Sequence, residues 1–112
     1  MEAKFFDNWS IQLRKGILEL CILNSIKDRS FYGYDIVRTL KGIPGLVISE
    51  GTIYPILSRL KREDFVQTTV KESAEGPARK YYELTPKGLQ ILQDMNDYWQ
   101  DIKNGTDSLK VE

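Results

Sequence analysis

The segment from Glu50 to Thr85 constrains the fold most strongly, because a helix-periodic stretch is followed there by two strand-like runs. In the first part, apolar residues recur at the i, i+3, i+4, i+7 spacing of one helix face, and we expect all four in the core: Ile53, Ile56, Leu57 and Leu60. The runs FVQTTVKES and ARKYYELT then flank a Gly-Pro turn at residues 75–78, with Tyr82 and Leu84 pointing inward. A basic helix followed by a hairpin predicts a winged helix-turn-helix.

Apolar periodicity predicts three further helices, over residues 10–27, over residues 32–41, and from Pro86 to about Gly105. Thr85 is expected to cap the last helix, and Pro55 to lie in or near the first turn of the third. The predicted fold is mainly α with a small β-hairpin. It has three parts: an N-terminal arm (1–9), a winged-helix DNA-binding domain (10–85), and a C-terminal dimerisation helix and tail (86–112).

The charge of the chain is distributed unevenly. Its 112 residues, enough for one domain, carry no net charge, which counts against nucleic-acid binding. Residues 52–80, however, carry six basic and four acidic side chains, a net +2, whereas residues 86–112 carry three basic and five acidic ones, a net −2. This asymmetry permits a DNA-binding face on the helix and hairpin.

Several functional classes are disfavoured by the composition. Histidine is absent and Cys21 is the single cysteine, so no intrachain disulfide or Cys/His metal site is expected, and Cys21 reads as a core residue. No nucleophile elbow or phosphate-binding glycine loop is present, so we expect neither an enzyme nor a cofactor. The sequence shows no signal peptide and no apolar stretch long enough to span a membrane, which predicts a cytoplasmic protein.

Four sequence blocks carry a resemblance to a known family: LRKGILELCIL (13–23), FYGYDIVRTL (31–40), EGTIYPILSRL (50–60) and GPARKYYELTPKG (76–88). In this order they cover about three quarters of the chain, which resembles the PadR family of bacterial transcriptional regulators. The resemblance implies a winged-helix DNA-binding domain whose C-terminal helix forms a homodimer. It also implies a repressor released by a small molecule. The single C-terminal helix is similar to the short PadR-like subgroup, which includes regulators that respond to planar aromatic drugs.

Candidate DNA contacts lie on three elements. The third helix offers residues for base edges, backbone and phosphate in the major groove of a pseudo-palindromic operator: Thr52, Tyr54, Ser58, Arg59, Lys61 and Arg62. Tyr32 and Tyr34 begin the second helix, where they either bind phosphate or pack under the wing. On the wing, Arg79 and Lys80 reach phosphate or the minor groove, or form a surface pair such as Lys80 with Glu72. Because neighbouring strand residues point to opposite sides, only one of the two is expected to reach DNA.

The last helix carries the candidate dimer and ligand residues. Its apolar positions follow a 3, 4, 3 spacing, which predicts a dimer seam made by Leu92, Met95, Trp99 and Ile102. Trp99 is either part of this dimer core or a platform for a planar ligand, to which Trp9 could also contribute. Asp97 and Asp101 could favour a cationic ligand. The alternative to a DNA-binding regulator is a winged helix that serves only protein interaction, which the neutral net charge supports.

Overall fold

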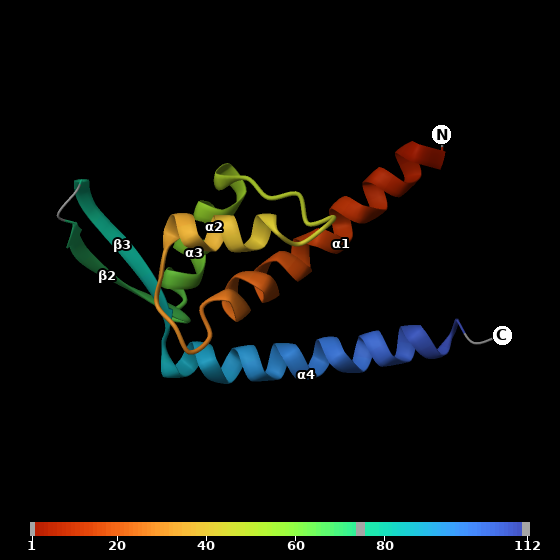
Figure 1. Cartoon of the computed structure of the whole chain (residues 1–112). Coiled ribbons are helices and arrows are strands. Elements are labelled where there is room, and N and C mark those ends of the chain that lie inside the picture. Colours follow the sequence, from red (N-terminus) through yellow and green to blue (C-terminus); the bar gives the residue numbers. More distant parts are fainter. Residues whose placement is uncertain (1, 74–75, 111–112) are drawn as a thin grey trace.

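The computed structural model describes residues 2–73 and 76–110 as mainly helical, with a three-stranded antiparallel sheet and a long C-terminal helix (Figure 1). This confirms the predicted winged helix-turn-helix class. The elements in chain order are α1 (Glu2–Ser25), β1 (Phe31–Tyr32), α2 (Gly33–Lys41), α3 (Glu50–Arg62), β2 (Val66–Ser73), β3 (Gly76–Leu84) and α4 (Pro86–Ser108).

The sheet has the strand order β1-β3-β2. The hairpin register places Lys71 opposite Arg79, Thr69 opposite Tyr81 and Val66 opposite Leu84. On the other edge of β3, Tyr32 lies opposite Tyr81. The two-residue strand β1 was not predicted, because such a short strand shows no alternation in sequence. Of the predicted turn, residues 76–78 belong to β3, and residue 75 lies outside the described residues.

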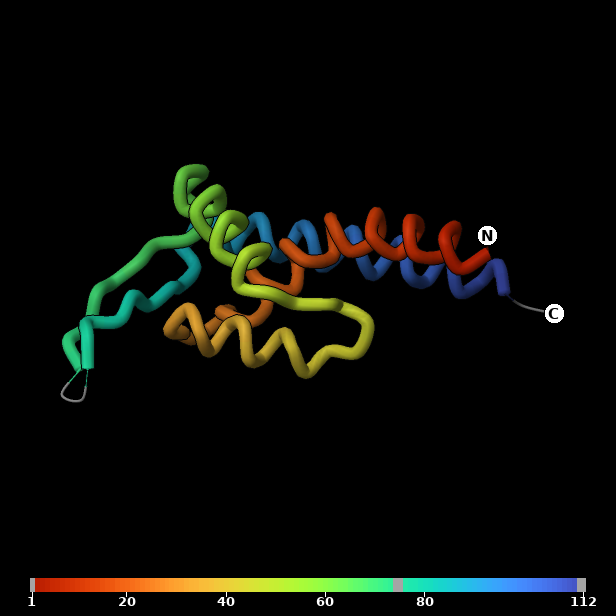
Figure 2. Tube along the Cα trace, turned by 90° about the horizontal axis from the view of Figure 1, so that it is seen from above, coloured from red at the N-terminus to blue at the C-terminus, as the bar shows by residue number. Residues whose placement is uncertain are grey.

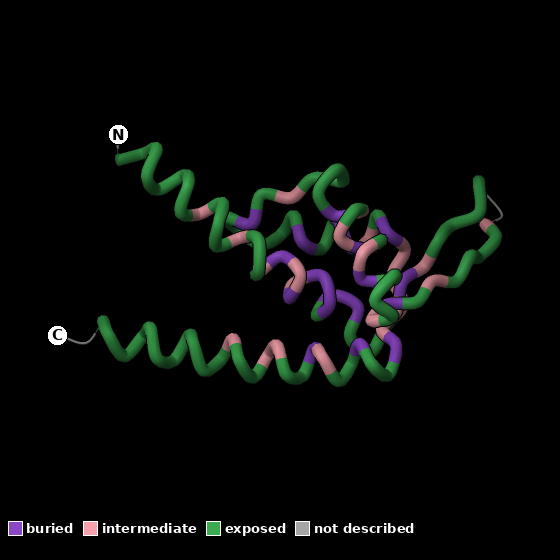
Figure 3. Tube along the Cα trace, turned by 180° about the vertical axis from the view of Figure 1, so that it is seen from behind, coloured by how far each residue is buried: buried purple, intermediate pink, exposed green. Residues whose placement is uncertain are grey.

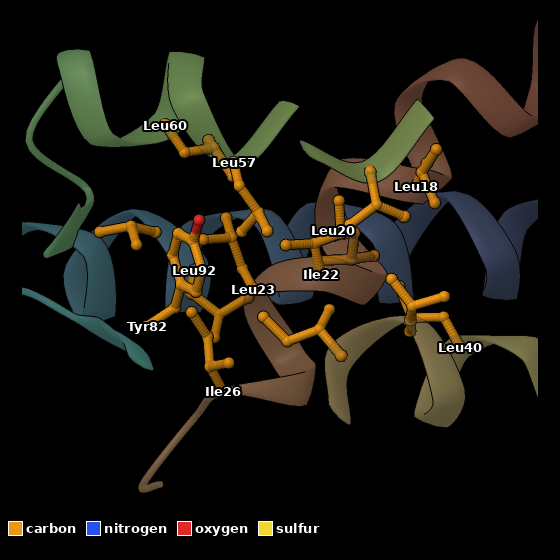
Figure 4. Close-up of a cluster of buried hydrophobic side chains, with 14 of the residues drawn as sticks. Leu18, Leu20, Ile22, Leu23, Ile26, Leu40, Leu57, Leu60, Tyr82 and Leu92 are labelled. Atoms are coloured by element: carbon orange, nitrogen blue, oxygen red, sulfur yellow. The ribbon is translucent and has the colours of Figure 1, made fainter. Parts of the chain in front are cut away.

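The core forms where the second half of α1 meets α2, α3, the sheet and the start of α4 (Figure 4). Its largest fully buried side chains come from all four helices, the turn after α1 and β2: Ile22, Leu23, Ile26, Ile36, Val37, Leu40, Ile53, Leu57, Val66 and Leu92. Leu60 and Tyr82 are buried as predicted, whereas Ile56 and Leu84 are half-buried at the edge of the core. The helical face predicted for α3 is therefore correct in direction and slightly too wide.

A small cluster of contacts joins α4 to the base of the hairpin. The Thr85 hydroxyl accepts a hydrogen bond from the Gly88 backbone N–H at 2.9 Å and donates one to the Asp64 carbonyl at 2.6 Å. This confirms Thr85 as the cap of α4. Gly88 itself packs on the backbone of Phe65, so closely that a Cβ atom at residue 88 would lie 1.9 Å from the Phe65 carbonyl oxygen. The start of α4 is thus fitted to the wing domain without space for a side chain.

The structure corrects two predicted boundaries. Residues 2–9 are not a separate arm but the first turns of α1, and the Ser10 hydroxyl, expected at a helix start, donates back to the Asp7 carbonyl at 2.9 Å. Helix α4 continues through Gly105 to Ser108, whose hydroxyl likewise bonds the Gly105 carbonyl. Serine and glycine are weak helix terminators when the flanking residues favour a helix, which explains both errors. Pro55 lies inside α3 in its second turn, next to the first turn as expected.

Helices α1 and α4 project from the core in the same direction, so both chain termini lie at one end of an elongated molecule of 57 × 33 × 22 Å (Figures 1 and 2). Buried residues gather at the winged-helix end, while the distal halves of both helices are exposed (Figure 3). Within the part of the chain that the structure describes, no helix is both long and apolar enough to cross a membrane.

Candidate nucleic-acid interface and effector groove

The outward surface of α3 is polar and basic. Ile53, Leu57 and Leu60 anchor the helix in the core, and successive helical residues are about 100° apart, so Ser58 and Arg62 point away from the core. The predicted contacts Thr52, Ser58, Lys61 and Arg62 are all exposed. This surface is accessible enough to enter a groove of DNA.

Tyr54 is half-buried because its ring packs on the first residue of α2. A Cβ atom added at Gly33 would lie 2.9 Å from the Tyr54 Cε1 atom, so only glycine allows this approach. Burial, followed by the charge of Glu50, raises the pKa of the Tyr54 hydroxyl, which keeps the hydroxyl protonated and able to donate a hydrogen bond. Tyr54 therefore couples α3 to the N-terminus of α2 as well as bordering the exposed surface.

Arg59 already has partners within the chain. Its guanidinium lies 2.8 Å from the Glu19 carboxylate of α1 and 3.5 Å from Glu63, one turn further along α3. The hydrogen bond to Glu19 raises the pKa of Arg59 further above its ordinary value. Arg59 would have to exchange Glu19 for a phosphate or a base before it could contact DNA.

The two tyrosines at the start of α2 differ in environment. Tyr32 is half-buried, and the Arg79 guanidinium lies over its ring at 4.9 Å from the centroid. Tyr34 is 46% exposed, and its ring centroid lies 6.5 Å from that of Tyr32. Tyr32 thus packs beneath a wing side chain, whereas Tyr34 is open to solvent beside it.

Arg79 and Lys80 lie on opposite faces of β3, as strand geometry requires. Arg79 shares its face of the strand with Tyr81, and Lys80, on the other face, lies opposite Val70. Among residues 2–73 and 76–110, neither Arg79 nor Lys80 has a carboxylate within salt-bridge distance. Sequence reasoning missed Lys71, whose ammonium group lies 4.5 Å from the Tyr81 ring centroid. The hairpin register, which pairs Lys71 with Arg79, is the signal that could have found it.

A second feature is an apolar groove of 670 Å³ between α1 and α4. From α4 it is lined by Met95, Trp99 and Ile102 together with Asp94 and Tyr98, and α1 supplies the opposite wall: Gln12, Leu13, Gly16, Ile17 and Leu20.

Trp99 also borders a second cavity, of 510 Å³, which includes Cys21, Asn24 and Arg29. Burial raises the pKa of the Cys21 thiol. Reciprocal hydrogen bonds of 3.0 Å between the Asn24 and Asn96 amides connect the two helices at this cavity.

The other predicted ligand residues lie away from Trp99. Asp97 and Asp101 are each two residues from it, about 200° around the helix, and they do not line the groove. Asp94 is the carboxylate that does. Trp9 is 52% exposed beside Phe6, with ring centroids 6.0 Å apart, and it does not line the groove either.

The predicted dimer seam requires one correction. Leu92 is 1% exposed and packs in the core of its own chain, so it presents no surface to a second copy. Met95 and Trp99 are half-buried, and Ile102 is 48% exposed. The spacing along α4 was read correctly as a single apolar stripe, but its first position serves the winged-helix core.

These elements define a winged-helix protein: α2 and α3 form the helix-turn-helix, and β2 and β3 form the wing. The transcriptional regulator PadR-like family matches residues 22–94, well over half of the chain. The chain therefore belongs to the PadR-like family, as the sequence blocks predicted. Its members are transcriptional regulators, and the protein is a regulator and not an enzyme.

Solved structures with the same fold cover nearly the whole chain. A PadR-like transcriptional regulator from Bacillus cereus is 38% identical, covers 90% of this chain and 99% of its own, and superposes with a TM-score of 0.81. A PadR family regulator from Eggerthella lenta is 26% identical over 96% of this chain and 94% of its own, with a TM-score of 0.83. Bacillus subtilis PadR, solved in complex with operator DNA, is 31% identical over 70% of this chain and 46% of its own, with a TM-score of 0.62.

Proposed function

We propose that the protein is a homodimeric, sequence-specific DNA-binding repressor that a small planar aromatic ligand releases from its operator. The observation that carries the DNA-binding part is the exposed polar surface of α3 beside the cations of the wing. In winged proteins such a helix enters the major groove, while the wing contacts the adjacent backbone or minor groove. The structure of Bacillus subtilis PadR with operator DNA supports the same role here.

The homodimer is supported by apolar side chains that the single chain leaves uncovered. Leu13 and Ile102 line the α1–α4 groove and are 46% and 48% exposed, and Tyr98 beside them is 71% exposed. Such a surface is costly in water, and a second copy would bury it. A two-fold dimer predicts a pseudo-palindromic operator with half-sites about 34–36 Å apart.

The effector part rests on the chemistry of the groove. Trp99 offers a flat aromatic face, its neighbours are apolar, and Asp94 supplies a negative charge, so the groove suits a planar cationic compound. Such a ligand releases DNA only if it binds the DNA-incompetent arrangement of the two recognition helices more tightly. Asp97 and Asp101, on the other side of α4, would act on a cation only at longer range.

The DNA-binding proposal is tested by measuring affinity for the promoter region of the protein's own gene between 50 and 200 mM salt, roughly the range over which phosphate contacts dominate. Arg62→Ala should weaken binding and lower the salt slope by about one, because Arg62 is exposed and free to reach phosphate. Arg59→Ala should weaken it less, because Arg59 first has to leave Glu19. If DNA is not bound and a protein partner instead survives nuclease treatment, the winged helix is an interaction module, as the neutral charge would favour.

The effector proposal is tested by titrating planar cationic dyes against tryptophan fluorescence in a Trp9→Phe background, which leaves Trp99 as the reporter. Dye binding should quench Trp99 and weaken operator binding together. Asp94→Asn should weaken binding of cationic dyes, with Asp101→Asn as the charge-matched control on the other side of α4. Equal effects of the two substitutions would remove the groove from the mechanism.

A further inference from the structure

One face of the wing carries two cations on two aromatic rings. In the register of the sheet, Lys71 lies opposite Arg79, and Tyr32 lies opposite Tyr81. Because Arg79 and Tyr81 are two residues apart in β3, all four side chains project from the same face. The Lys71 ammonium lies 4.5 Å from the Tyr81 ring centroid and the Arg79 guanidinium 4.9 Å from that of Tyr32. We call Lys71, Arg79, Tyr32 and Tyr81 the wing ladder.

Among the residues that the structure describes, no carboxylate balances the charges in the ladder. Like charges directly opposite each other on neighbouring strands repel, and such pairs destabilise a sheet. Across the described ranges 2–73 and 76–110, neither Lys71 nor Arg79 has a carboxylate within 4.0 Å, whereas Arg59 on α3 has two. An anion placed between the two cations would remove this repulsion.

The rings hold these cations in place. Each cation lies over the ring that is its diagonal neighbour, one strand away and two residues along, so both contacts follow from the same register. The two ring centroids are themselves 6.0 Å apart, which links the pairs into one unit. A long cationic side chain loses less freedom on binding when a ring already restricts it.

We propose that the wing ladder is a preorganised site for the phosphate backbone of DNA, in which Lys71 and Arg79 bind phosphate and Tyr32 and Tyr81 are positioning residues. This rests on the proposed function and adds to it. Lys71 becomes a second wing contact, and Tyr32 acts through its ring face on Arg79 and not through its hydroxyl on phosphate. Lys80, on the opposite face, is not part of the site.

The ladder can first be tested without DNA by NMR. Ring currents should shift the side-chain methylene protons of Lys71 upfield, and the shift should disappear in Tyr81→Leu and persist in Tyr81→Phe, which keeps the ring. Unshifted Lys71 protons in the wild type would overturn the ladder itself.

The second arm measures operator affinity at several salt concentrations. Lys71→Ala should lower the salt slope by about one, with Lys103→Ala on α4 as the charge-matched control that leaves it unchanged. Tyr81→Leu should weaken binding about two- to five-fold at unchanged thermal stability, and Tyr81→Phe should restore it. Because Tyr81 acts through Lys71, adding Tyr81→Leu to Lys71→Ala should weaken binding no further.

The outcomes separate the two proposals. A wild-type protein without salt-dependent DNA binding overturns the proposed function, and the assignment of the ladder to phosphate with it. A wild-type protein that binds DNA, but whose affinity is indifferent to Lys71→Ala, overturns the ladder alone. Additive effects of Lys71→Ala and Tyr81→Leu would show that the ring has a general structural role and would overturn its positioning role.

Discussion

The winged-helix end of the molecule and the distal halves of α1 and α4 differ in how many of their side chains have partners within the chain. At the winged-helix end, three candidate DNA-contacting side chains have partners within the chain: Tyr54 packs on Gly33, Arg79 on Tyr32 and Lys71 on Tyr81. In the distal halves of α1 and α4, large apolar side chains remain exposed, among them Phe5, Phe6, Trp9, Leu13, Tyr98 and Ile102. The side chains named for the first region are thus paired within the chain, whereas those named for the second are exposed to solvent.

Under the proposed function, this difference suits the two regions to different partners. At the winged-helix end Arg59 must first leave Glu19, but aromatic rings already restrict Lys71 and Arg79, so these two side chains lose little ordering entropy on binding a rigid polyanion. An uncovered apolar groove instead gains free energy from any occupant that removes it from water. The start of α4, fixed by Thr85 and Gly88, connects the two regions, and we expect a change in the groove to reach the wing through it.

Among these predictions, the largest effect is expected from Gly88→Ala, which disrupts the contact between the start of α4 and the base of the hairpin. The new Cβ atom would lie 1.9 Å from the Phe65 carbonyl oxygen, so α4 or the hairpin base must move. We expect the free energy of unfolding to fall by about 3 kcal/mol, measured by urea denaturation at one protein concentration. Gly105→Ala, in α4 with nothing within 4 Å, is the matched control. It should stabilise by about 0.5–1 kcal/mol, and similar effects of the two changes would contradict the close fit.

The uncovered region can be tested alone with Ile102→Asp. A carboxylate in the groove should raise the dissociation constant of the homodimer about 100-fold, or about 2.8 kcal/mol, measured by sedimentation equilibrium. Because Ile102 is 48% exposed and Leu92 still anchors α4, the monomer should keep its fold. Gln100→Asp, on the other side of α4, adds the same charge and should leave the dimer intact. Equal dissociation of both variants would place the dimer interface elsewhere.

The smallest effect is expected from alkaline pH, and it reports on both regions. Burial raises the pKa values of Cys21 at the α1–α4 cavity and of Tyr82 in the core, and burial together with Glu50 raises that of Tyr54. The unfolded chain therefore loses these protons first, so the free energy of unfolding should fall as pH rises.

The loss should begin near the ordinary thiol value of about 8.5 and continue near the tyrosine value of about 10. Urea denaturation at pH values from about 8 to about 11 checks both parts. Cys21→Ser should remove the first part only and leave the tyrosine part unchanged. A flat profile in the wild type would show that these groups are equally accessible in the folded and unfolded chains.

The predictable parts of the molecule were those that depend on local pattern. The face of α3 that carries Ile53, Leu57 and Leu60 follows from helical periodicity, and the cap at Thr85 follows from a threonine before Pro86. Local pattern misled at Ser10 and Gly105, because a terminator is effective only where the neighbouring residues do not favour the helix. The family blocks placed the fold correctly, since they span the winged-helix domain that the PadR-like family matches.

The candidate site was less predictable, because it depends on partners distant in sequence. Arg59 and Arg62 are equivalent in sequence, yet only Arg59 has Glu19, from another helix, within 2.8 Å. Lys71 gains its proposed role from a register that pairs it with Arg79, and the groove that Asp94 lines together with Trp99 exists only because α1 packs beside α4.

The sequence by itself determined the class of the protein, the order of its four helices and its hairpin, and the apolar face of α3, because hydrophobic periodicity and capping act between residues close along the chain. Only the tertiary structure decided which charged and aromatic side chains of the Glu50–Thr85 segment are already paired and which remain open. It also decided that Leu92 belongs to the core and Ile102 to the groove. Such assignments depend on contacts between residues far apart in the chain, whose distances are set by how helices and strands pack and not by the spacing of residues within them.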